Sequence, residues 1–314
     1  MHRQRDFLLL VTLAVAATTP ALGQAVAPAA DTSSTASVAD FSGIWTHPFM
    51  PGYEPPASGP RPVTNRSRVQ AGPQKGVSNY NQLVGDYTNP ILKPTAADVL
   101  KKHAEISLAG DAYPTPINQC WPEPVPFILS EMGMQLIRQP DKVTILYSRD
   151  HQVRQVRMNQ SHLARVSPSW YGDSVGHYEG NTLVVDTVGI KTDRPVAMVD
   201  HYGTPYTQSL HVVERYRLLD YEAAKDGLER AAKENARVSG ASAPEADPNY
   251  RGKHLQLQFT VEDEGAFTTP WSATITYGRP LLSGEWPEFI CAENPHEYFA
   301  GKDTAVPTAD KPDF

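Results

Sequence analysis

The segment from Gly172 to Glu179 carries ionisable side chains at alternating positions. Side chains alternate between the two faces of a β-strand, so a strand here places Asp173, His177 and Glu179 on one face. An imidazole between carboxylates can relay protons or supply metal ligands, which makes Asp173 and His177 candidate catalytic residues. The alternative is an ordinary solvated face of an antiparallel strand.

Two further carboxylates interrupt apolar strand patterns. Asp186 stands between Val184 and Val188, and burial among such neighbours raises the pKa of an unpaired carboxyl group. Glu214 interrupts the apolar row of residues 210–218, as an inward-facing general base in a barrel wall would. The alternative for Glu214 is a salt bridge to an arginine on a neighbouring strand, since buried charges are generally paired.

His201 and Tyr202 form a third candidate pair, in a turn-rich segment between Asp200 and Gly203. Loops at the open end of a barrel often carry binding and catalytic residues. His201 would act as a general base, and Tyr202 would donate a hydrogen bond to a carbonyl oxygen. The alternative is a turn in which the histidine is only a solvated polar group.

The run Gly172-Asp-Ser-Val-Gly176 matches the Gly-x-Ser-x-Gly pattern of serine hydrolases, with Ser174 as nucleophile. That pattern requires a helix after the serine, whereas the following residues lead into a tight turn at Gly180-Asn181. A glycine-rich strand entry is therefore the favoured interpretation. The histidines lack the spacing of a zinc site, and the sequence has no phosphate-binding or dinucleotide-binding motif, so we predict neither metal nor cofactor.

Alternating apolar and polar residues from Met134 onward indicate that these candidates lie on β-strands. Strands are predicted at about 134–138, 142–148, 152–158, 174–179, 182–188, 208–219, 254–261 and 271–277. This number of short strands, separated by turns, favours a mainly β fold, either an antiparallel barrel or a sandwich.

The remaining segments surround this predicted sheet. Residues 48–94 are rich in Pro, Gly, Asn and Gln, which predicts an irregular wrap. A short helix is predicted over 95–108, with Thr95 as its cap. The insertion 222–253 begins with a predicted surface helix and continues as a flexible loop. We expect one barrel-type domain over 41–300, followed by a tail over 301–314.

The N-terminus has the order of a secretory signal peptide, with basic residues, an apolar run over 7–17 and small residues before Gly23. A membrane anchor would need a longer apolar run, of about 20 residues. We therefore predict cleavage near Gly23, a disordered leader over 24–40, and a periplasmic or secreted product. The net charge of −7 does not favour binding to nucleic acid or anionic lipid, so small molecules are the expected partners. The oligomeric state is not predicted.

The chain has two cysteines, Cys120 and Cys291, both in loop-like contexts. An oxidising compartment would permit a disulfide bond between them, which we predict. Two buried free thiols, or one catalytic thiol, are the alternatives.

Two resemblances add to this picture. Phe41-Ser-Gly-Ile-Trp45 is similar to the Gly-x-Trp opening of lipocalin-like, calycin-type barrels, in which an arginine from a late strand packs on the tryptophan. That resemblance implies Arg215 or Arg217 as the partner of Trp45. The run Gly172-Asp-Ser-Val-Gly-His-Tyr-Glu-Gly-Asn-Thr-Leu-Val-Val-Asp-Thr187 resembles a widespread family of secreted bacterial β-proteins of undefined function. That likeness spans roughly residues 40–295 and implies no catalytic residue.

Together, these residues indicate a barrel enzyme that performs cofactor-free acid and base chemistry, as hydrolase, lyase or isomerase, on a small, partly apolar molecule. The alternative is a lipocalin-like binding protein, which needs the same apolar pocket but no positioned proton donor.

Overall fold

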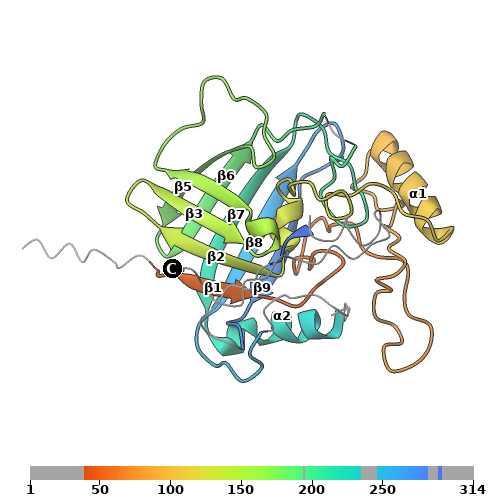
Figure 1. The fold of residues 1–314 in the computed structure, drawn as a ribbon, viewed down its shortest axis with the longest axis horizontal. Coiled ribbons are helices and arrows are strands. Elements are labelled where there is room, and N and C mark those ends of the chain that lie inside the picture. Colours follow the sequence, from red (N-terminus) through yellow and green to blue (C-terminus); the bar gives the residue numbers. More distant parts are fainter. Residues whose placement is uncertain (1–38, 194, 235–245, 282–288, 292–314) are drawn as a thin grey trace, which may run out of the picture. The chain divides into compact units, whose positions relative to one another are not determined.

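Within the part of the chain that the structure describes, there are nine β-strands (Figure 1). The computed structural model describes residues 39–193, 195–234, 246–281 and 289–291. The strands are β1 (Gly43–Thr46), β2 (Gly133–Arg138), β3 (Lys142–Tyr147), β4 (Val153–Met158), β5 (Asp173–Glu179), β6 (Thr182–Val188), β7 (His211–Leu219), β8 (His254–Glu262) and β9 (Trp271–Tyr277). All eight predicted strands are confirmed, and β1 is an addition to them.

The strands follow one another in a single sheet in chain order, from β1 to β9. Thr46 and Gly278 exchange two backbone hydrogen bonds of 3.0 and 2.8 Å, which bring the two ends of the sheet together as a nearly closed barrel. The barrel alternative is thus confirmed over the sandwich. One pair departs from the antiparallel pattern, because β4 and β5 run parallel through only two register pairs. The connection over 159–172 is long enough to return the chain to the same end of the sheet.

Two α-helices lie within the described residues, α1 (Pro94–Leu108) and α2 (Tyr221–Glu234). The capping prediction for α1 was wrong, because the helix begins with Pro94 after an N-cap at Lys93 that has no side-chain hydrogen bond. Proline suits the first helical position because it lacks an N–H that would otherwise be unpaired. In α2, a Cβ at Gly227 would lie 2.4 Å from Thr276 Oγ1 of β9, so glycine lets this helix pack closely on the sheet.

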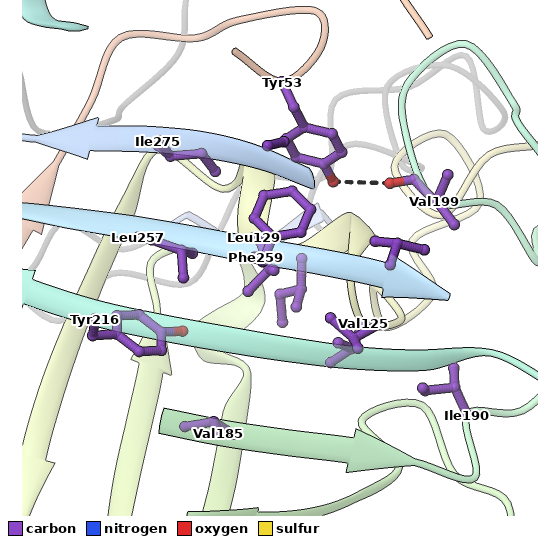
Figure 2. Packing of buried hydrophobic residues seen from close by; sticks show 14 of the residues in the cluster. Tyr53, Val125, Leu129, Val185, Ile190, Val199, Tyr216, Leu257, Phe259 and Ile275 are labelled. Carbon is purple, nitrogen blue, oxygen red and sulfur yellow. Dashed lines mark hydrogen bonds between the residues drawn. The ribbon is translucent and has the colours of Figure 1, made fainter. Parts of the chain in front are cut away.

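The interior of the barrel is filled by the inward side chains of its strands. Figure 2 shows this packing for four neighbouring strands, with the fully buried Val185, Tyr216, Leu257 and Ile275. The N-terminal wrap adds Tyr53, whose hydroxyl lies 2.8 Å from the carbonyl oxygen of Val199. Burying each such aliphatic side chain contributes about 1.5–3 kcal/mol, so this packing is the main source of stability.

Trp45 is fully buried in the core, but its cation partner is neither of the predicted arginines. The guanidinium of Arg279, just beyond β9, lies 3.6 Å from the centre of the Trp45 ring. Arg215 and Arg217 occupy outward positions of β7, where Arg215 pairs with Glu179. The prediction was wrong because β7 presents its alternate positions, such as Tyr216, to the interior.

The Cys120–Cys291 disulfide is present, with a Cα–Cα distance of 5.4 Å, so the free-thiol alternatives do not hold. A β-barrel with a disulfide fits a secreted barrel protein. None of the described helices has the length and apolar character needed to cross a membrane. The predicted signal peptide over 1–23, most of the leader and the tail over 301–314 lie outside the described residues, as does part of the 222–253 insertion.

Candidate functional site

Glu214 points into the barrel and is fully buried, as the alternation of β7 requires. Its carboxylate forms a two-pronged ion pair with Arg154 of β4, with N–O distances of 2.6 and 3.0 Å. The Tyr216 hydroxyl donates a further bond of 2.6 Å to Oε2. The salt-bridge alternative therefore describes Glu214, although its partner comes from a strand that is not adjacent in the sheet.

Ser174 completes this interior network, and no histidine among the described residues hydrogen-bonds to it. Its hydroxyl accepts hydrogen bonds of 3.1 Å from Nε and Nη2 of Arg154 and lies 3.1 Å from Thr187 Oγ1. The chain continues from Ser174 as strand β5 and not as a helix. The strand-entry interpretation of the glycine-rich run is confirmed, and Ser174 is not placed as a nucleophile.

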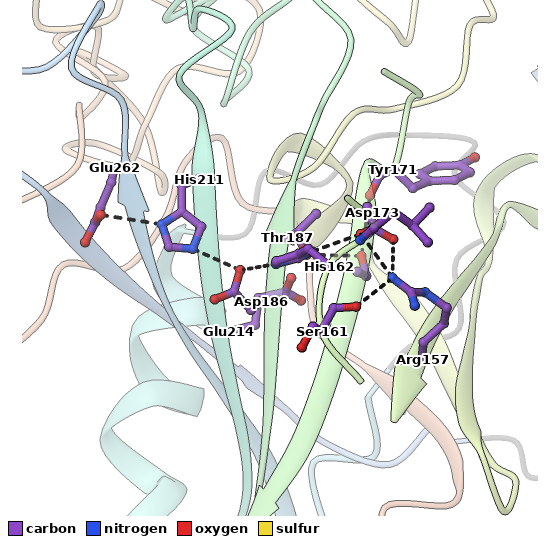
Figure 3. A network of polar contacts seen from close by, with 12 residues as sticks. Arg157, Ser161, His162, Tyr171, Asp173, Asp186, Thr187, His211, Glu214 and Glu262 are labelled. Atoms are coloured by element: carbon purple, nitrogen blue, oxygen red, sulfur yellow. Dashed lines mark hydrogen bonds and ion pairs between the residues drawn. The ribbon is translucent and has the colours of Figure 1, made fainter. Parts of the chain in front are cut away.

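Asp173 and Asp186 lie in a second network, on the outer face of the barrel (Figure 3). His162, from the connection over 159–172, bridges them, with Nδ1 3.0 Å from Asp173 and Nε2 2.9 Å from Asp186. His211 of β7 also contacts Asp186, at 3.0 Å, and Arg157 pairs with Asp173 at 2.8 Å. Asp186 is thus partly exposed and paired, and not buried among its valine neighbours as the sequence pattern indicated.

The two carboxylate partners of His162 favour the charged form of its ring. Partial burial lowers its pKa, but hydrogen bonds to Asp186 and Asp173 outweigh this and raise the pKa above the usual 6.5. Because both ring nitrogens are engaged, His162 has no free position from which to act as a base. Its geometry instead fastens the 159–172 connection to the sheet.

The free energy of unfolding is expected to fall as the pH rises through the raised pKa of His162. The contribution of the charged imidazole is complete below about pH 6.5 and is lost once the ring deprotonates in the folded state. Thermal unfolding midpoints from about pH 5.5 to about 8.5 should decline less in His162→Gln than in the wild type. The exposed His177, which contacts only Glu179, provides the control His177→Gln. Equal slopes in wild type and His162→Gln would contradict this assignment.

Of the residues that the alternation pattern grouped with it, His177 contacts Glu179 but not Asp173. It is exposed, and its Nε2 lies 3.2 Å from Glu179, which also pairs with Arg215. Asp173 shares the outer face of β5 but is engaged by His162 and Arg157. The solvated-face alternative therefore describes His177, whereas Asp173 belongs to a clamp.

His201 and Tyr202 lie in a buried turn organised by Asp200, whose Oδ1 accepts the backbone N–H groups of Tyr202 and Thr204. Burial raises the pKa of Asp200 to about 6, although these hydrogen bonds oppose the change. Burial, with the nearby charge of Arg149, lowers the pKa of His201 to about 3. His201 therefore stays neutral, with Nε2 3.0 Å from Ser130 Oγ, and is not the solvated turn residue of the alternative interpretation.

A cavity of about 300 Å³ lies between the N-terminal wrap and α2, outside the strands. Its walls come from residues 50–55, 64, 65, 68 and 78 of the wrap, from Tyr202, and from the C-terminal end of α2. Two ion pairs border it, Arg68 with Glu234 at 2.9 Å and Arg230 with Glu54. The Pro-rich wrap thus forms one wall, and Tyr202 is the predicted site residue that lines the cavity.

A buried carboxyl pair, Glu123 and Glu131, was missed by the sequence reasoning. Burial raises the pKa of both groups, and the charge of Glu131 raises that of Glu123 further. The Nε atom of Arg149 lies 3.2 Å from Glu123, yet neither oxygen of Glu123 accepts a hydrogen bond from a described residue. A glutamate between prolines looks like a solvated loop residue, so no sequence signal pointed to Glu123.

Comparison of the chain with models of protein families, with curated proteins and with solved structures found no match. The family resemblances of the sequence therefore stay predictions. No group of three or more His, Cys, Asp or Glu side chains is arranged to hold a metal ion in the part of the chain that the structure describes. Of the predicted catalytic residues, the structure brings Asp173 and Asp186 together, while Glu214, His177 and the His201–Tyr202 turn lie in three separate settings.

Proposed function

We propose that the protein binds a small, partly apolar molecule in the cavity between the wrap and α2. The observation that carries this proposal is the cavity itself, whose volume of about 300 Å³ is at the lower end of the range for small-molecule sites. Its walls combine apolar groups, such as Met50 and Pro55, with polar and charged side chains, four of which form the two ion pairs described above. The barrel interior is instead filled by side chains, including the Arg154–Glu214 pair.

A second candidate function, cofactor-free acid and base chemistry, is favoured by the Glu123–Glu131 pair. Two carboxyl groups close enough to interact cannot both ionise readily, so one holds a proton while the other carries the charge. Such a pair can supply an acid and a base in the same reaction. The Arg149 guanidinium can stabilise the carboxylate that carries the charge. Many hydrolase, lyase and isomerase reactions use this combination.

The experiment is a thermal-shift screen of the purified protein with small aromatic, terpenoid and ester compounds. Compounds that raise the unfolding temperature are expected to lose this effect in Thr64→Trp, because the exposed Thr64 lines the cavity and an indole would fill it. Gln208→Trp, at an exposed position away from the cavity, should keep the effect. Hits that stabilise Thr64→Trp as much as the wild type would place binding elsewhere and refute the proposal.

Each stabilising compound is then recovered and analysed by mass spectrometry to separate the two functions. A compound that returns intact supports binding alone. A compound that returns chemically changed by the wild type, but intact from Glu123→Gln and Glu131→Gln, supports catalysis by the carboxyl pair.

A further inference from the structure

We infer that the ligand of this cavity carries a carbonyl oxygen, which accepts a hydrogen bond from the Tyr202 hydroxyl. This inference rests on the proposed binding function and specifies its ligand as a small apolar ketone or ester. The inference follows from the contacts between Tyr202 and the wrap.

Tyr202 is only 3% exposed, and its side chain is fixed in a slot formed by two glycines. A Cβ on Gly85 would lie 2.8 Å from Tyr202 Cβ, and a Cβ on Gly52 would lie 2.4 Å from the hydroxyl oxygen. Gly52 is itself part of the cavity wall. The absence of a side chain there places the Tyr202 hydroxyl directly at that wall.

The Tyr202 hydroxyl forms no hydrogen bond with any residue that the structure describes, although its oxygen lies close to Gly52 in the cavity wall. Burial, together with the charge of Asp200, raises the pKa of Tyr202 well above 10, so the proton remains in place. A hydroxyl that stands at a cavity wall without a protein partner favours a ligand that supplies an acceptor oxygen.

Several other polar groups of the wall already have hydrogen-bond or ion-pair partners in the protein. Arg68 is held by Glu234 and by the Ser78 hydroxyl at 3.0 Å, and Arg230 is held by Glu54. Tyr53 also lines the cavity, but its hydroxyl already reaches the carbonyl oxygens of Pro126 and Val199. Among the buried polar side chains of the wall, Tyr202 is thus the one whose hydroxyl has no protein partner, whereas the Lys233 side chain is exposed to solvent.

The test compares two probes that differ in a single group, 4-phenylbutan-2-one and butylbenzene, by calorimetric titration of the protein. The wild type is expected to bind the ketone about tenfold more tightly than the hydrocarbon, as one hydrogen bond in a buried site provides. Tyr202→Phe should remove most of this preference and leave the hydrocarbon affinity within about twofold. Tyr206→Phe removes a hydroxyl that lies outside the cavity, bonded to the Lys191 carbonyl, and should keep the preference.

Gly52→Ala provides a second variant in case Tyr202→Phe fails to fold. The added methyl group displaces the hydroxyl, so the ketone preference should fall there as well. Equal affinities of the wild type for ketone and hydrocarbon would overturn the inference while leaving the binding function intact. Binding of neither probe, with no stabilising compound in the wider screen, would instead refute the proposed function itself.

Discussion

Glu214→Gln is expected to destabilise the fold by about 3–5 kcal/mol, because it leaves the Arg154 guanidinium buried without its counter-charge. The Arg154 side chain is 1% exposed and that of Glu214 is 0% exposed, so water cannot compensate for the loss. Burial lowers the pKa of Arg154, but the charge of Glu214 and the neighbouring tyrosines together raise it above its usual value. A guanidinium group keeps its proton in proteins, so Arg154 remains charged in the variant and lacks a counter-charge.

The measurement is urea-induced unfolding of the wild type and of Glu214→Gln, followed by circular dichroism. A double variant, Arg154→Met with Glu214→Leu, should be more stable than Glu214→Gln, because it removes both charges and keeps an apolar filling. The matched control is Glu179→Gln, which breaks the exposed ion pair with Arg215 and should change the stability little. A Glu214→Gln protein as stable as the Glu179→Gln protein would show that the buried pair is not required.

The strands and their faces could be predicted from the sequence because each side of the barrel wall has its own pattern. Alternation places Glu214 in the interior and Arg215 outside, as the structure has them. The same rule applied to β4 places Arg154 beside Val156 on the buried face, so the partner of Glu214 was within reach of sequence reasoning. Which strands face each other across the barrel could not be predicted from the sequence, because the order of strands depends on long-range pairing.

The candidate site was harder to predict, because its residues meet through irregular segments. Asp186 follows an apolar strand pattern, yet it is partly exposed and paired with His162, which arrives from the 159–172 connection. Tyr202 was found through its turn-rich context, whereas Gly52 and the rest of the cavity wall lie in the wrap. No period of two or of 3.6 residues describes such a wrap, so its contacts follow only from the folded structure.

Removing the disulfide bond is expected to destabilise the protein by about 5 kcal/mol on the loop-entropy model, since the bond joins residues 171 apart in sequence. The bond also supports a second set of contacts. Asp150 donates a backbone hydrogen bond of 2.7 Å to the Phe289 carbonyl and accepts one of 2.6 Å from the Cys291 N–H. The Arg149 guanidinium donates to the Ile117 carbonyl at 3.2 Å. The Cys120 region is thus tied to the turn that carries Arg149.

Cys120→Ser, Cys291→Ser and the double variant should therefore all show a similar loss in the free energy of unfolding, measured in urea without reductant. The wild type in dithiothreitol should match them, because the reductant opens the same loop. Addition of dithiothreitol to the double variant is the control and should change nothing. A wild-type unfolding midpoint that does not respond to reductant would contradict the stabilising role. A loss much greater than about 5 kcal/mol would mean that the bond also holds Arg149 against Glu123, since the carboxyl pair then loses its nearest cation along with the loop constraint.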